Sequence, residues 1–471
     1  MNPPYRFETD AYAAELHERF ADLADGTESD TIVTVAGRLL LRRGQGKLVF
    51  ADLRDGTGRV QLFALARSTP RFDEFADLDL GDWLGVTGVV MRTKTGELSV
   101  RVDDWQLLAE WRHPFPDKWH GVTDTELRYR QRYVDLWVND ESRDRLLARS
   151  KLVADVRRWL DERGFVEVET PVLHPVPGGA AARPFSTHHN ALDTDLYLRI
   201  APELYLKRLV VGGIEKVFEI ARVFRNEGLS TRHNPEFTML ELYWAYADYH
   251  DCMDLVEELV STLAATHTGD TVVELDGRPI DLTPPWRRAS MIELIEEHTG
   301  LVISLDMDRD ELADHAGRLD VEVKPYYGVG KLILEIYEKN VEGHLWDPVF
   351  VMDYPKEVSP LARDHRDQPG LVERFEPIVA GRELGNGFTE LVDPDEQLAR
   401  FTAQAADRDA GDAEAMPIDY DYVRALEYGL PPTVGLGIGI DRLVMLLTGT
   451  GTIRDVILFP TLRPDPGAGG V

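Results

Sequence analysis

The sequence of 471 residues predicts an α+β fold, with a small β-barrel ahead of a larger domain of helices on an antiparallel sheet. Three observations support this. Short apolar runs separated by glycine and polar turns fill residues 31–112. Beyond residue 142, strand and helix patterns follow one another without strict alternation. The length also exceeds what one hydrophobic core organises, so we expect two domains.

The composition indicates a globular protein of a reducing compartment. Hydrophobic residues make up 43% of the chain, and no apolar run approaches the length that crosses a bilayer, so no membrane partner is expected. The start, Met-Asn-Pro-Pro-Tyr, lacks the regions of a signal peptide. Because Cys252 is the single cysteine, a disulfide framework and a cysteine-rich zinc site are excluded. We therefore expect a cytoplasmic protein in which oxygen atoms hold any metal.

The net charge of −31, taken alone, argues against nucleic-acid binding, because phosphates require a positive surface. Global charge still permits local basic patches. Two groups of basic residues offer such patches: Arg42, Arg43, Lys47, Arg54 and Arg59, and then Arg128, Arg130 and Arg132. Charge therefore leaves a nucleic-acid partner open.

The first 112 residues predict a helical leader and a barrel. A short helix is expected over residues 11–24 of the leader, residues 1–30, with Thr9 or Asp10 as its cap and Gly26 at its end. Five strands then follow at 33–35, 48–53, 59–63, 83–90 and 98–102. Five short strands in this space predict an oligonucleotide-binding (OB) fold over residues 31–112.

Strand alternation gives this barrel an outer face with a possible function. If Val49 faces the core, Phe50 and Asp52 point outward, and Gln61 and Phe63 share the outer face of the next strand. An outward aromatic beside an amide suits stacking and edge recognition of an unpaired base. The alternative is an isolated exposed aromatic, which is common on protein surfaces.

Residues 113–141 are interpreted as a linker, residues 142–463 as the second domain and residues 464–471 as a tail. Helical periodicity is expected over 142–163, with Gly164 as the stop, and over 202–211. Strands are expected at 165–171, 216–225, 236–244, 372–391 and 433–440.

The predicted hairpin of residues 216–244 combines acidic and aromatic residues around a Gly-containing turn. Period two places Phe237, Met239, Glu241 and Tyr243 on one face. A carboxylate beside a phenol can bind an ammonium group. The alternative is a half-buried strand whose glutamate pairs with a structural arginine.

Residues 373–390 are rich in carboxylates. Glu376 and Glu383 could face each other across a hairpin and supply the oxygen ligands that magnesium shares with phosphates. Asn386, Phe388 and Glu390 alternate onto one face, which makes a second acidic and aromatic patch for a cationic substrate.

Residues 435–442 contain alternating glycines but not a dinucleotide fingerprint, because Ile440 stands where the last glycine or alanine is required. Such glycines would make a strand flat enough for a planar base. Asp441 is expected to cap the next helix, whereas Arg442 in its first turn opposes the helix dipole and requires an anion, such as a triphosphate. Glu203, in the first turn of another predicted helix, is ordinary dipole complementation by itself.

Together these segments resemble the class II aminoacyl-tRNA synthetases, and across residues 31–463 they are similar to the lysyl-tRNA synthetase family. Gly164-Phe-Val-Glu-Val-Glu-Thr-Pro171 looks like motif 1, Phe224-Arg-Asn-Glu227 with its return strand like motif 2, and Gly437-Ile-Gly-Ile-Asp-Arg442 like motif 3. Residues 178–185, 201–207 and 385–390 resemble stretches that distinguish the lysine enzyme from its aspartate and asparagine relatives.

The resemblance implies ATP-dependent activation of L-lysine to lysyl-adenylate, followed by transfer to the 3′-hydroxyl of lysine tRNA. It implies that Arg225 touches both the lysine carboxylate and the α-phosphate and that Arg442 holds the γ-phosphate. The other implied ATP and magnesium contacts are Glu227, Asn234 and Phe237 at adenosine, and Glu376 and Glu383 at Mg²⁺.

The resemblance also implies the remaining contacts and partners. Gly179 and Glu203 would lie at the α-amino group of lysine, and Glu390 with Tyr243 at the ε-ammonium. The residues implied around the side chain and carboxylate are Glu241, Tyr243, Asn386, Phe388 and Glu390. Those implied to contact the uridine-rich anticodon are Arg43, Phe50, Gln61 and Glu97. Motif 1 implies a homodimer.

Two alternatives remain. One is a paralogue that attaches lysine to a protein, as elongation-factor-P ligases do, although those enzymes lack the anticodon barrel. The other is a non-catalytic RNA-binding regulator, although Arg225, Glu376, Glu383 and Arg442 are all in place.

Overall fold

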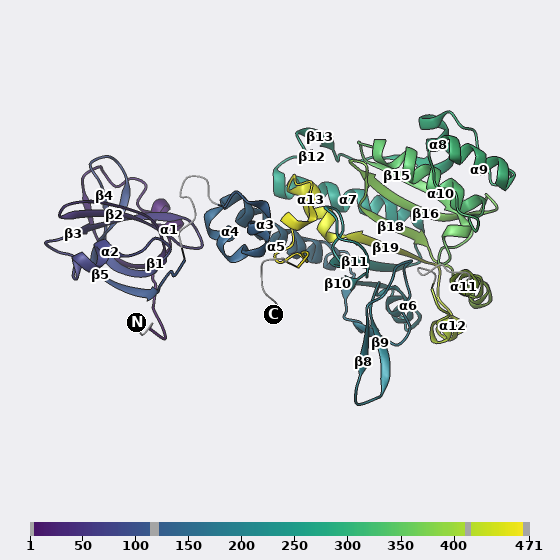
Figure 1. Ribbon diagram of the computed structural model, residues 1–471, viewed down its shortest axis with the longest axis horizontal. Helices are drawn as coiled ribbons and strands as arrows, with labels where there is room; N and C mark the ends of the chain where they lie inside the picture. Colours follow the sequence, from purple (N-terminus) through teal and green to yellow (C-terminus); the bar gives the residue numbers. More distant parts are fainter. Residues whose placement is uncertain (1–3, 114–121, 410–415, 465–471) are drawn as a thin grey trace. The chain divides into compact units, whose positions relative to one another are not determined.

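The chain forms two units in the computed structural model, which describes residues 4–113, 122–409 and 416–464 (Figure 1). The first unit is Met1–Arg128 with Trp137–Asn139, and the second is Tyr129–Leu136 with Asp140–Val471. Parts of the predicted leader (1–3), linker (114–121) and tail (465–471) lie outside the described residues. The predicted domain boundaries stay predictions.

The first unit contains the predicted barrel. Its strands close in the order β1-β2-β3-β5-β4. Their bounds are β1 Glu28–Gln45, β2 Leu48–Arg54, β3 Arg59–Leu65, β4 Trp83–Arg92 and β5 Leu98–Ala109. The strands β1 and β5 run further than their apolar periodicity predicts, because bulges bend them through the corners of the barrel. Two short helices accompany the strands: α1 Ala13–Arg19 and α2 Phe72–Asp77.

The leader helix is shorter than predicted, and its predicted cap was wrong. Tyr12 is the N-cap of α1 and makes no side-chain capping bond. Asp10 instead accepts a hydrogen bond from the backbone N–H of Thr34 at 2.7 Å. The first helical amide, that of Ala13, donates to the Asp55 carboxylate at 2.6 Å. This amide, which has no acceptor within its own helix, thus finds one in the β2–β3 turn, a segment remote in sequence.

The second unit is built on one large, mostly antiparallel sheet, which confirms the α+β prediction. Its order is β14-β15-β16-β18-β19-β11-β10-β6, and β17 pairs with β16. Within this sheet, the pairs β14–β15 and β10–β6 of the described strands are parallel. The bounds are β6 Val166–Glu167, β10 Lys216–Phe224, β11 Glu236–Ala245, β14 Arg287–Ser290, β15 Val349–Pro355, β16 Leu371–Val379, β17 Arg382–Glu383, β18 Gly385–Thr389 and β19 Thr433–Gly439.

Two small sheets complete the strands. One pairs β12 (Val272–Leu275) with β13 (Arg278–Asp281). The other has the order β7-β9-β8, with bounds β7 Leu173–His174, β8 Ser186–His189 and β9 Thr194–Leu198. Figure 1 shows the β8–β9 hairpin projecting from the rest of its unit.

The remaining described helices follow the barrel in the sequence. They are α3 Thr125–Arg130, α4 Arg132–Val138, α5 Asp140–Asp161, α6 Glu203–Val211, α7 Tyr249–Thr268, α8 Met291–Thr299, α9 Arg309–Arg318, α10 Val329–Asn340, α11 Pro394–Asp409, α12 Tyr420–Glu427 and α13 Ile440–Leu447. Three short 3₁₀ turns are η1 Glu342–His344, η2 Lys356–Val358 and η3 Ile453–Asp455. Of the helices that the structure describes, none has the length and apolar character needed to cross a membrane.

The two faces of the central strands pack on different hydrophobic cores. On β11, Leu240 and Leu242 belong to a hydrophobic core shared with α5, α7 and α13. Glu241 and Tyr243 alternate with them and therefore lie on the opposite face. Both faces therefore pack on hydrophobic cores, and Glu241 lies on the face whose core includes Tyr243 and Phe388.

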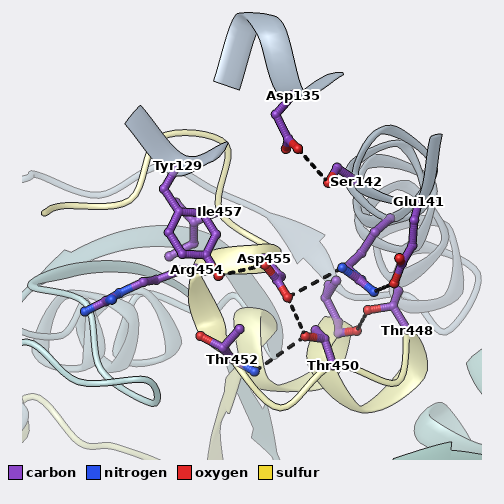
Figure 2. Close-up of polar contacts among 12 residues, drawn as sticks. Tyr129, Asp135, Glu141, Ser142, Thr448, Thr450, Thr452, Arg454, Asp455 and Ile457 are labelled. Atoms are coloured by element: carbon purple, nitrogen blue, oxygen red, sulfur yellow. Dashed lines mark hydrogen bonds and ion pairs between the residues drawn. The ribbon is translucent and has the colours of Figure 1, made fainter. Parts of the chain in front are cut away.

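Part of the predicted linker is structural. Arg132, predicted as a member of a basic patch, is only 1% exposed. It donates to the backbone carbonyl of Leu458 at 2.9 Å and pairs with Asp135 at 2.6 Å. Nearby, the Tyr129 hydroxyl donates to Asp455 at 2.9 Å (Figure 2). The first turn of α4 is therefore tied to the C-terminal segment of the second unit, and the basic-patch interpretation of Arg132 was wrong.

Candidate active site

The strand register brings the predicted acidic and aromatic residues onto one face. Gly437 of β19 lies between Glu241 of β11 and Asn386 of β18. In the same way, Gly435 lies between Tyr243 and Phe388. Directly opposed residues of neighbouring strands share a face. Two segments that are far apart in sequence therefore present their side chains together.

The glycines of β19 leave room for this cluster. A Cβ atom at Gly435 would lie 2.1 Å from Oε1 of Glu390 and 2.6 Å from Cε1 of Tyr243. Any side chain at 435 would thus displace both residues. Because Glu390 and Tyr243 lie over Gly435, this position does not offer the flat platform for a planar base that the glycines predicted.

Glu390 is buried with spare acceptor capacity. It follows β18 and is 0% exposed. Its Oε2 contacts the ammonium of Lys207, whereas Oε1 has no hydrogen-bond partner among the described residues. Burial raises the pKa of Glu390 well above its usual range, and Lys207 opposes that rise. An unpaired buried acceptor of this kind suits a cationic ligand.

Gly179 and Glu203, both predicted near an α-amino group, are neighbours. Glu203 lies in the first turn of α6 and is 6% exposed. Gly179 has a φ of +87°, and a Cβ there would lie 3.0 Å from the Glu203 Cβ. Only glycine combines this backbone conformation with so close an approach.

Lys207 lies between Glu203 and Glu390. It is 0% exposed, and its Nζ donates to Glu203 Oε1 at 2.6 Å. The ring centroids of Phe388 and Tyr243 lie 5.3 and 5.9 Å from Nζ. The two facing carboxylates hold the pKa of Lys207 above its usual value, despite the opposing effect of burial. The residue is therefore an internal ammonium within the predicted lysine site.

Glu241 and Tyr243 are adjacent, as strand alternation predicts. The Tyr243 hydroxyl donates to Glu241 Oε2 at 3.4 Å, so the phenol is bonded to Glu241 and not to Glu390. Within the described part of the chain, no arginine or lysine lies at ion-pair distance from Glu241, so the structural-arginine alternative has no support. Burial raises the pKa of both groups well above their usual ranges.

Arg225 follows β10 and is prepared for an anion. Its guanidinium carbon lies 5.2 Å from the ring centroid of Phe237. Its Nε is buried and has no hydrogen-bond partner among the residues that the structure describes. Burial lowers the pKa of Arg225 from its usual value. A negatively charged group would satisfy the free donor and offset the desolvation.

The loop between β10 and β11 is closed locally. The backbone N–H of Arg225 donates to the carbonyl of Pro235 at 2.8 Å. The side chain of Asn234 donates to the Glu236 carbonyl at 2.6 Å and accepts from the Thr461 amide at 3.1 Å. Asn234 thus holds the loop to the C-terminal segment, whereas Glu227 is exposed on the loop.

Glu376 and Glu383 are diagonal neighbours, because Ile378 lies directly opposite Glu383. The pKa of Glu376 is raised to about 7, first by burial and then by Glu383. A third carboxylate, Glu342 of η1, also has a pKa raised to about 7, by burial and by these two glutamates. Arg374 compensates in part, since it donates to Glu376 at 2.6 Å. Repulsion among these carboxylates would be relieved by a divalent cation.

In the ranges that the structure covers, no three or more His, Cys, Asp or Glu residues form a ready-made metal site. Magnesium does not require such a cage, because it commonly uses one or two carboxylates together with substrate phosphates. The pair Glu376 and Glu383 fits that mode of binding.

Arg442 lies in the first turn of α13 and contacts the same hairpin. It donates to the backbone carbonyl of Glu383 at 2.6 Å and to its carboxylate at 3.2 Å. The predicted cap at Asp441 was wrong, because Gly439 is the N-cap. The Asp441 carboxylate accepts from the Thr238 amide at 2.8 Å instead. Asp441 therefore joins α13 to β11.

Three residues of this site were absent from the sequence prediction. Lys207 stands four residues after Glu203, and Arg374 stands two before Glu376, so helix and strand periodicity could have suggested both. Arg374 also donates to the Asn386 side chain at 2.9 Å, which connects a residue predicted to contact lysine with one predicted to hold the metal. No sequence pattern pointed to Glu342.

In the barrel, the four predicted anticodon residues gather on one outer surface. Arg43 lies opposite Phe50, and the Ser99 hydroxyl donates to Gln61 at 2.9 Å. The Phe50 ring packs on Phe63 at a centroid distance of 5.3 Å. Burial raises the pKa of Asp52, which lies opposite Gln61; Arg43 opposes this rise and Glu97 adds to it. The expected outward orientation of Phe50 and Gln61 agrees with their partial exposure beside buried neighbours.

Comparisons with known proteins agree with both units. Residues 33–108 match the OB-fold nucleic acid binding domain, and residues 124–463 match the tRNA synthetases class II (D, K and N). A lysine–tRNA ligase from Xanthomonas oryzae pv. oryzae (strain MAFF 311018) is 55% identical over 98% of this chain and 93% of its own length. One from Prochlorococcus marinus (strain MIT 9211) is 53% identical over 99% of this chain and 96% of its own. The chain therefore belongs to the class II tRNA synthetases of the D, K and N group.

Proposed function

We propose that this protein is a lysine–tRNA ligase, which activates L-lysine with ATP to lysyl-adenylate and transfers the lysyl group to lysine tRNA. The observation that carries the proposal is the fully buried Glu390 carboxylate, whose Oε1 has no hydrogen-bond partner among the described residues. A neutral or acidic amino acid would leave Oε1 without a partner, whereas an ammonium would satisfy it. The names of the similar ligases agree with this choice.

Each end of the lysine has a group of residues to bind it. The ε-ammonium binds Glu390 beside the ring of Tyr243, and the α-ammonium binds Glu203 next to Gly179. Asn386, held by Arg374, and Phe388 contact the side chain and carboxylate. Glu241 adds negative charge beneath the ligand.

The chemical step joins the lysine carboxylate to ATP. A carboxylate oxygen attacks the α-phosphorus, and the bond to the leaving pyrophosphate breaks. Arg225, whose buried Nε has no hydrogen-bond partner among the described residues, would contact both anions and stabilise the charge that develops as they approach. Arg442 binds the γ-phosphate, and Glu227, Asn234 and Phe237 bind adenosine, with Phe237 stacking on the base.

Glu376 and Glu383 would hold Mg²⁺, which supplies electrostatic neutralisation of the phosphates when bound. Arg374, which also donates to Asn386, would keep Glu376 in place. In the second step the tRNA 3′-hydroxyl attacks the activated carbonyl and AMP leaves.

The first unit would recognise the anticodon through Arg43, Phe50, Gln61 and Glu97. The paired rings of Phe50 and Phe63 suit stacking of an unpaired uridine, and Gln61 suits its edge. We further propose a homodimer formed through residues 164–171, and a cytoplasmic location, which the single buried Cys252 supports.

Two assays test the function together: lysine-dependent exchange of pyrophosphate into ATP, and charging of purified lysine tRNA. We expect both activities, with no exchange supported by aspartate or asparagine. Exchange without charging would favour a ligase that modifies a protein. Absence of both would favour a non-catalytic RNA-binding protein.

A further inference from the structure

Lys207 is a buried cation inside the proposed lysine site, and no step of the proposed reaction uses it. Lys207 lies on α6, and its ammonium is enclosed by groups from α6 and from other elements. Glu203 accepts from it at 2.6 Å, and Glu390 contacts it from beyond β18. The ring centroid of Tyr422 on α12 lies 5.9 Å away. The charge is therefore held at one place between the two carboxylates assigned to the two ends of the substrate.

The charged and titratable groups around Lys207 define the electrostatic balance of the site. They are Glu203 on α6, Glu241 and Tyr243 on β11, Glu390 beyond β18, Tyr422 on α12, Cys252 on α7 and Arg374 on β16. Arg374 is engaged by Glu376, and the phenols and the thiol are neutral at physiological pH because burial raises the pKa of each. Burial also raises the pKa of Glu203, Glu241 and Glu390, but Lys207 opposes that rise at Glu203 and Glu390, and Arg225 opposes it at Glu241. We count these three carboxylates as charged beside the one ammonium of Lys207.

We propose that Lys207 is a positioning and specificity residue, a built-in ammonium that leaves this site with two uncompensated negative charges, matching the two ammonium groups of lysine. It also ties Glu203 and Glu390 to one atom, and so sets the separation of the subsites for the α- and ε-ammonium groups. This inference rests on the proposed function and extends it. Without Lys207, three buried carboxylates would face one another, and one would take up a proton.

Lys207→Met tests this, because methionine keeps much of the side-chain shape without the charge. We expect the KM for lysine to rise about tenfold or more near neutral pH, since binding must then expel a proton. The KM for ATP should stay within about twofold of the wild-type value, because Lys207 lies among the residues proposed to bind the substrate lysine. Between about pH 6 and about pH 8 the lysine KM of the variant should fall, while that of the wild type stays nearly flat.

Calorimetry provides a readout that is independent of activity. Lysine titrations in two buffers of different ionisation enthalpy should show about one proton released per lysine bound by the variant and about none by the wild type. The control is Lys216→Met on β10, a half-buried lysine that donates to the Arg163 carbonyl at 3.0 Å outside the site. It should leave the lysine KM and proton release unchanged.

The outcomes separate the inference from the proposed function. A wild type without lysine-dependent exchange refutes the proposed function. An active wild type, with a Lys207→Met variant whose lysine KM is pH-independent and whose binding releases no proton, overturns only the role of Lys207. An equal rise in the KM values for lysine and ATP would also overturn it, because that indicates general disruption.

A second variant decides the case in which Lys207→Met does not fold. Removing one carboxylate with the ammonium, in Glu203→Gln/Lys207→Met, restores the original count of uncompensated charges. We expect this double variant to fold, with a Tm within a few degrees of Glu203→Gln alone. If the double variant also failed to fold while Glu203→Gln folded, Lys207 would be a packing residue and the inference would be wrong.

Discussion

At the scale of single residues, the site depends on buried charges that a ligand completes. Among the described residues, Oε1 of Glu390 and Nε of Arg225 have no hydrogen-bond partner, and Glu383 adds to the raised pKa of Glu376. Groups in this condition cost folding free energy, and such costs concentrate where a protein binds or reacts. In the proposed function, the acceptor of Glu390 would bind the substrate lysine and the donor of Arg225 would bind the phosphate.

Glu390→Gln should damage lysine binding selectively. The amide keeps the shape but loses the charge that pairs with the ε-ammonium, so we expect the lysine KM to rise about 100-fold. The KM for ATP should change by less than about twofold. Steady-state pyrophosphate exchange measures both. Glu297→Gln, in a surface pair with Arg287, is the matched control. An unchanged lysine KM would remove Glu390 from the site.

The ligand-free protein should become less stable as pH rises, because Glu376 has a raised pKa in the folded state. Its pKa is about 7 in the fold against an ordinary 4.5, so the folded state binds more protons between these values. The stabilisation of the folded state by protonated Glu376 is therefore fully present below about pH 4.5 and is lost as pH rises towards 7. Relative to Glu376→Gln, the wild type should lose on the order of 2 kcal/mol of unfolding free energy across this window.

Urea unfolding at several pH values in EDTA, without ATP, measures this difference. Glu258→Gln, in a surface pair with Arg163, should follow the wild-type pH profile. The constant loss caused by leaving Arg374 without its carboxylate partner does not alter the slope with pH. Parallel profiles for wild type and Glu376→Gln would contradict the raised pKa.

At the scale of elements, β19 shows why a strand rich in glycine is retained in the centre of a sheet. Glycine weakens a strand, but here it lets side chains from β11 and β18 meet above its backbone. One face of the strand still packs in the core through Leu436 and Ile438. The element thus packs in the core on one face and leaves room on the other for the side chains of Glu390 and Tyr243.

Gly435→Ala should therefore abolish lysine activation while ATP binding persists. The new Cβ would overlap Glu390 Oε1 and Tyr243 Cε1, at 2.1 and 2.6 Å. We expect lysine-dependent exchange to fall about 100-fold or more, with a Tm lower by several degrees. The control is Gly317→Ala in α9, where a Cβ meets nothing within 4 Å. Normal lysine kinetics in Gly435→Ala would contradict the described packing.

A substitution on the outer face of β2 or β3 should weaken tRNA binding without changing lysine activation. Phe50→Ala removes a ring that we assign to base stacking, an interaction of about 1–3 kcal/mol, so the KM for tRNA should rise about tenfold. Pyrophosphate exchange needs no tRNA and should be unchanged. Tyr12→Ala removes another aromatic of the same unit, 54% exposed, and serves as the control. An unaltered KM for tRNA would favour the alternative of an isolated exposed aromatic.

At the scale of the whole molecule, the site lies in one unit and the proposed anticodon surface in the other. The net charge of −31 does not prevent this arrangement, because recognition needs only local positive and aromatic groups. Exposed apolar residues on motif 1 and α5, Val166 and Leu147, are each 51% exposed. Such residues are consistent with an interface between two copies.

Val166→Glu should convert the proposed dimer into a monomer, because a buried charge at a two-fold interface meets its own copy. Sedimentation equilibrium should give twice the mass of one chain for the wild type and one chain for the variant. We expect exchange activity to fall as well. Val302→Glu, at an exposed valine outside motif 1, is the control. A monomeric wild type would refute the dimer.

The sequence by itself determined what depends on local geometry. Apolar periodicity predicted the barrel, α5, α6 and the β10–β11 hairpin, and period two placed Glu241 beside Tyr243, because both follow from the repeat of a strand or helix. The motifs identified the family, which the comparisons confirm. The individual ligand contacts stay predictions.

Only the tertiary structure decided which distant groups meet. It placed Lys207 against Glu390 and Glu376 diagonally from Glu383, paired the Ala13 amide of α1 with Asp55 and buried Arg132. Strand register, burial and charge pairing arise from contacts between segments that are remote in sequence. Propensity and periodicity, which act over a few residues, carry no information on them.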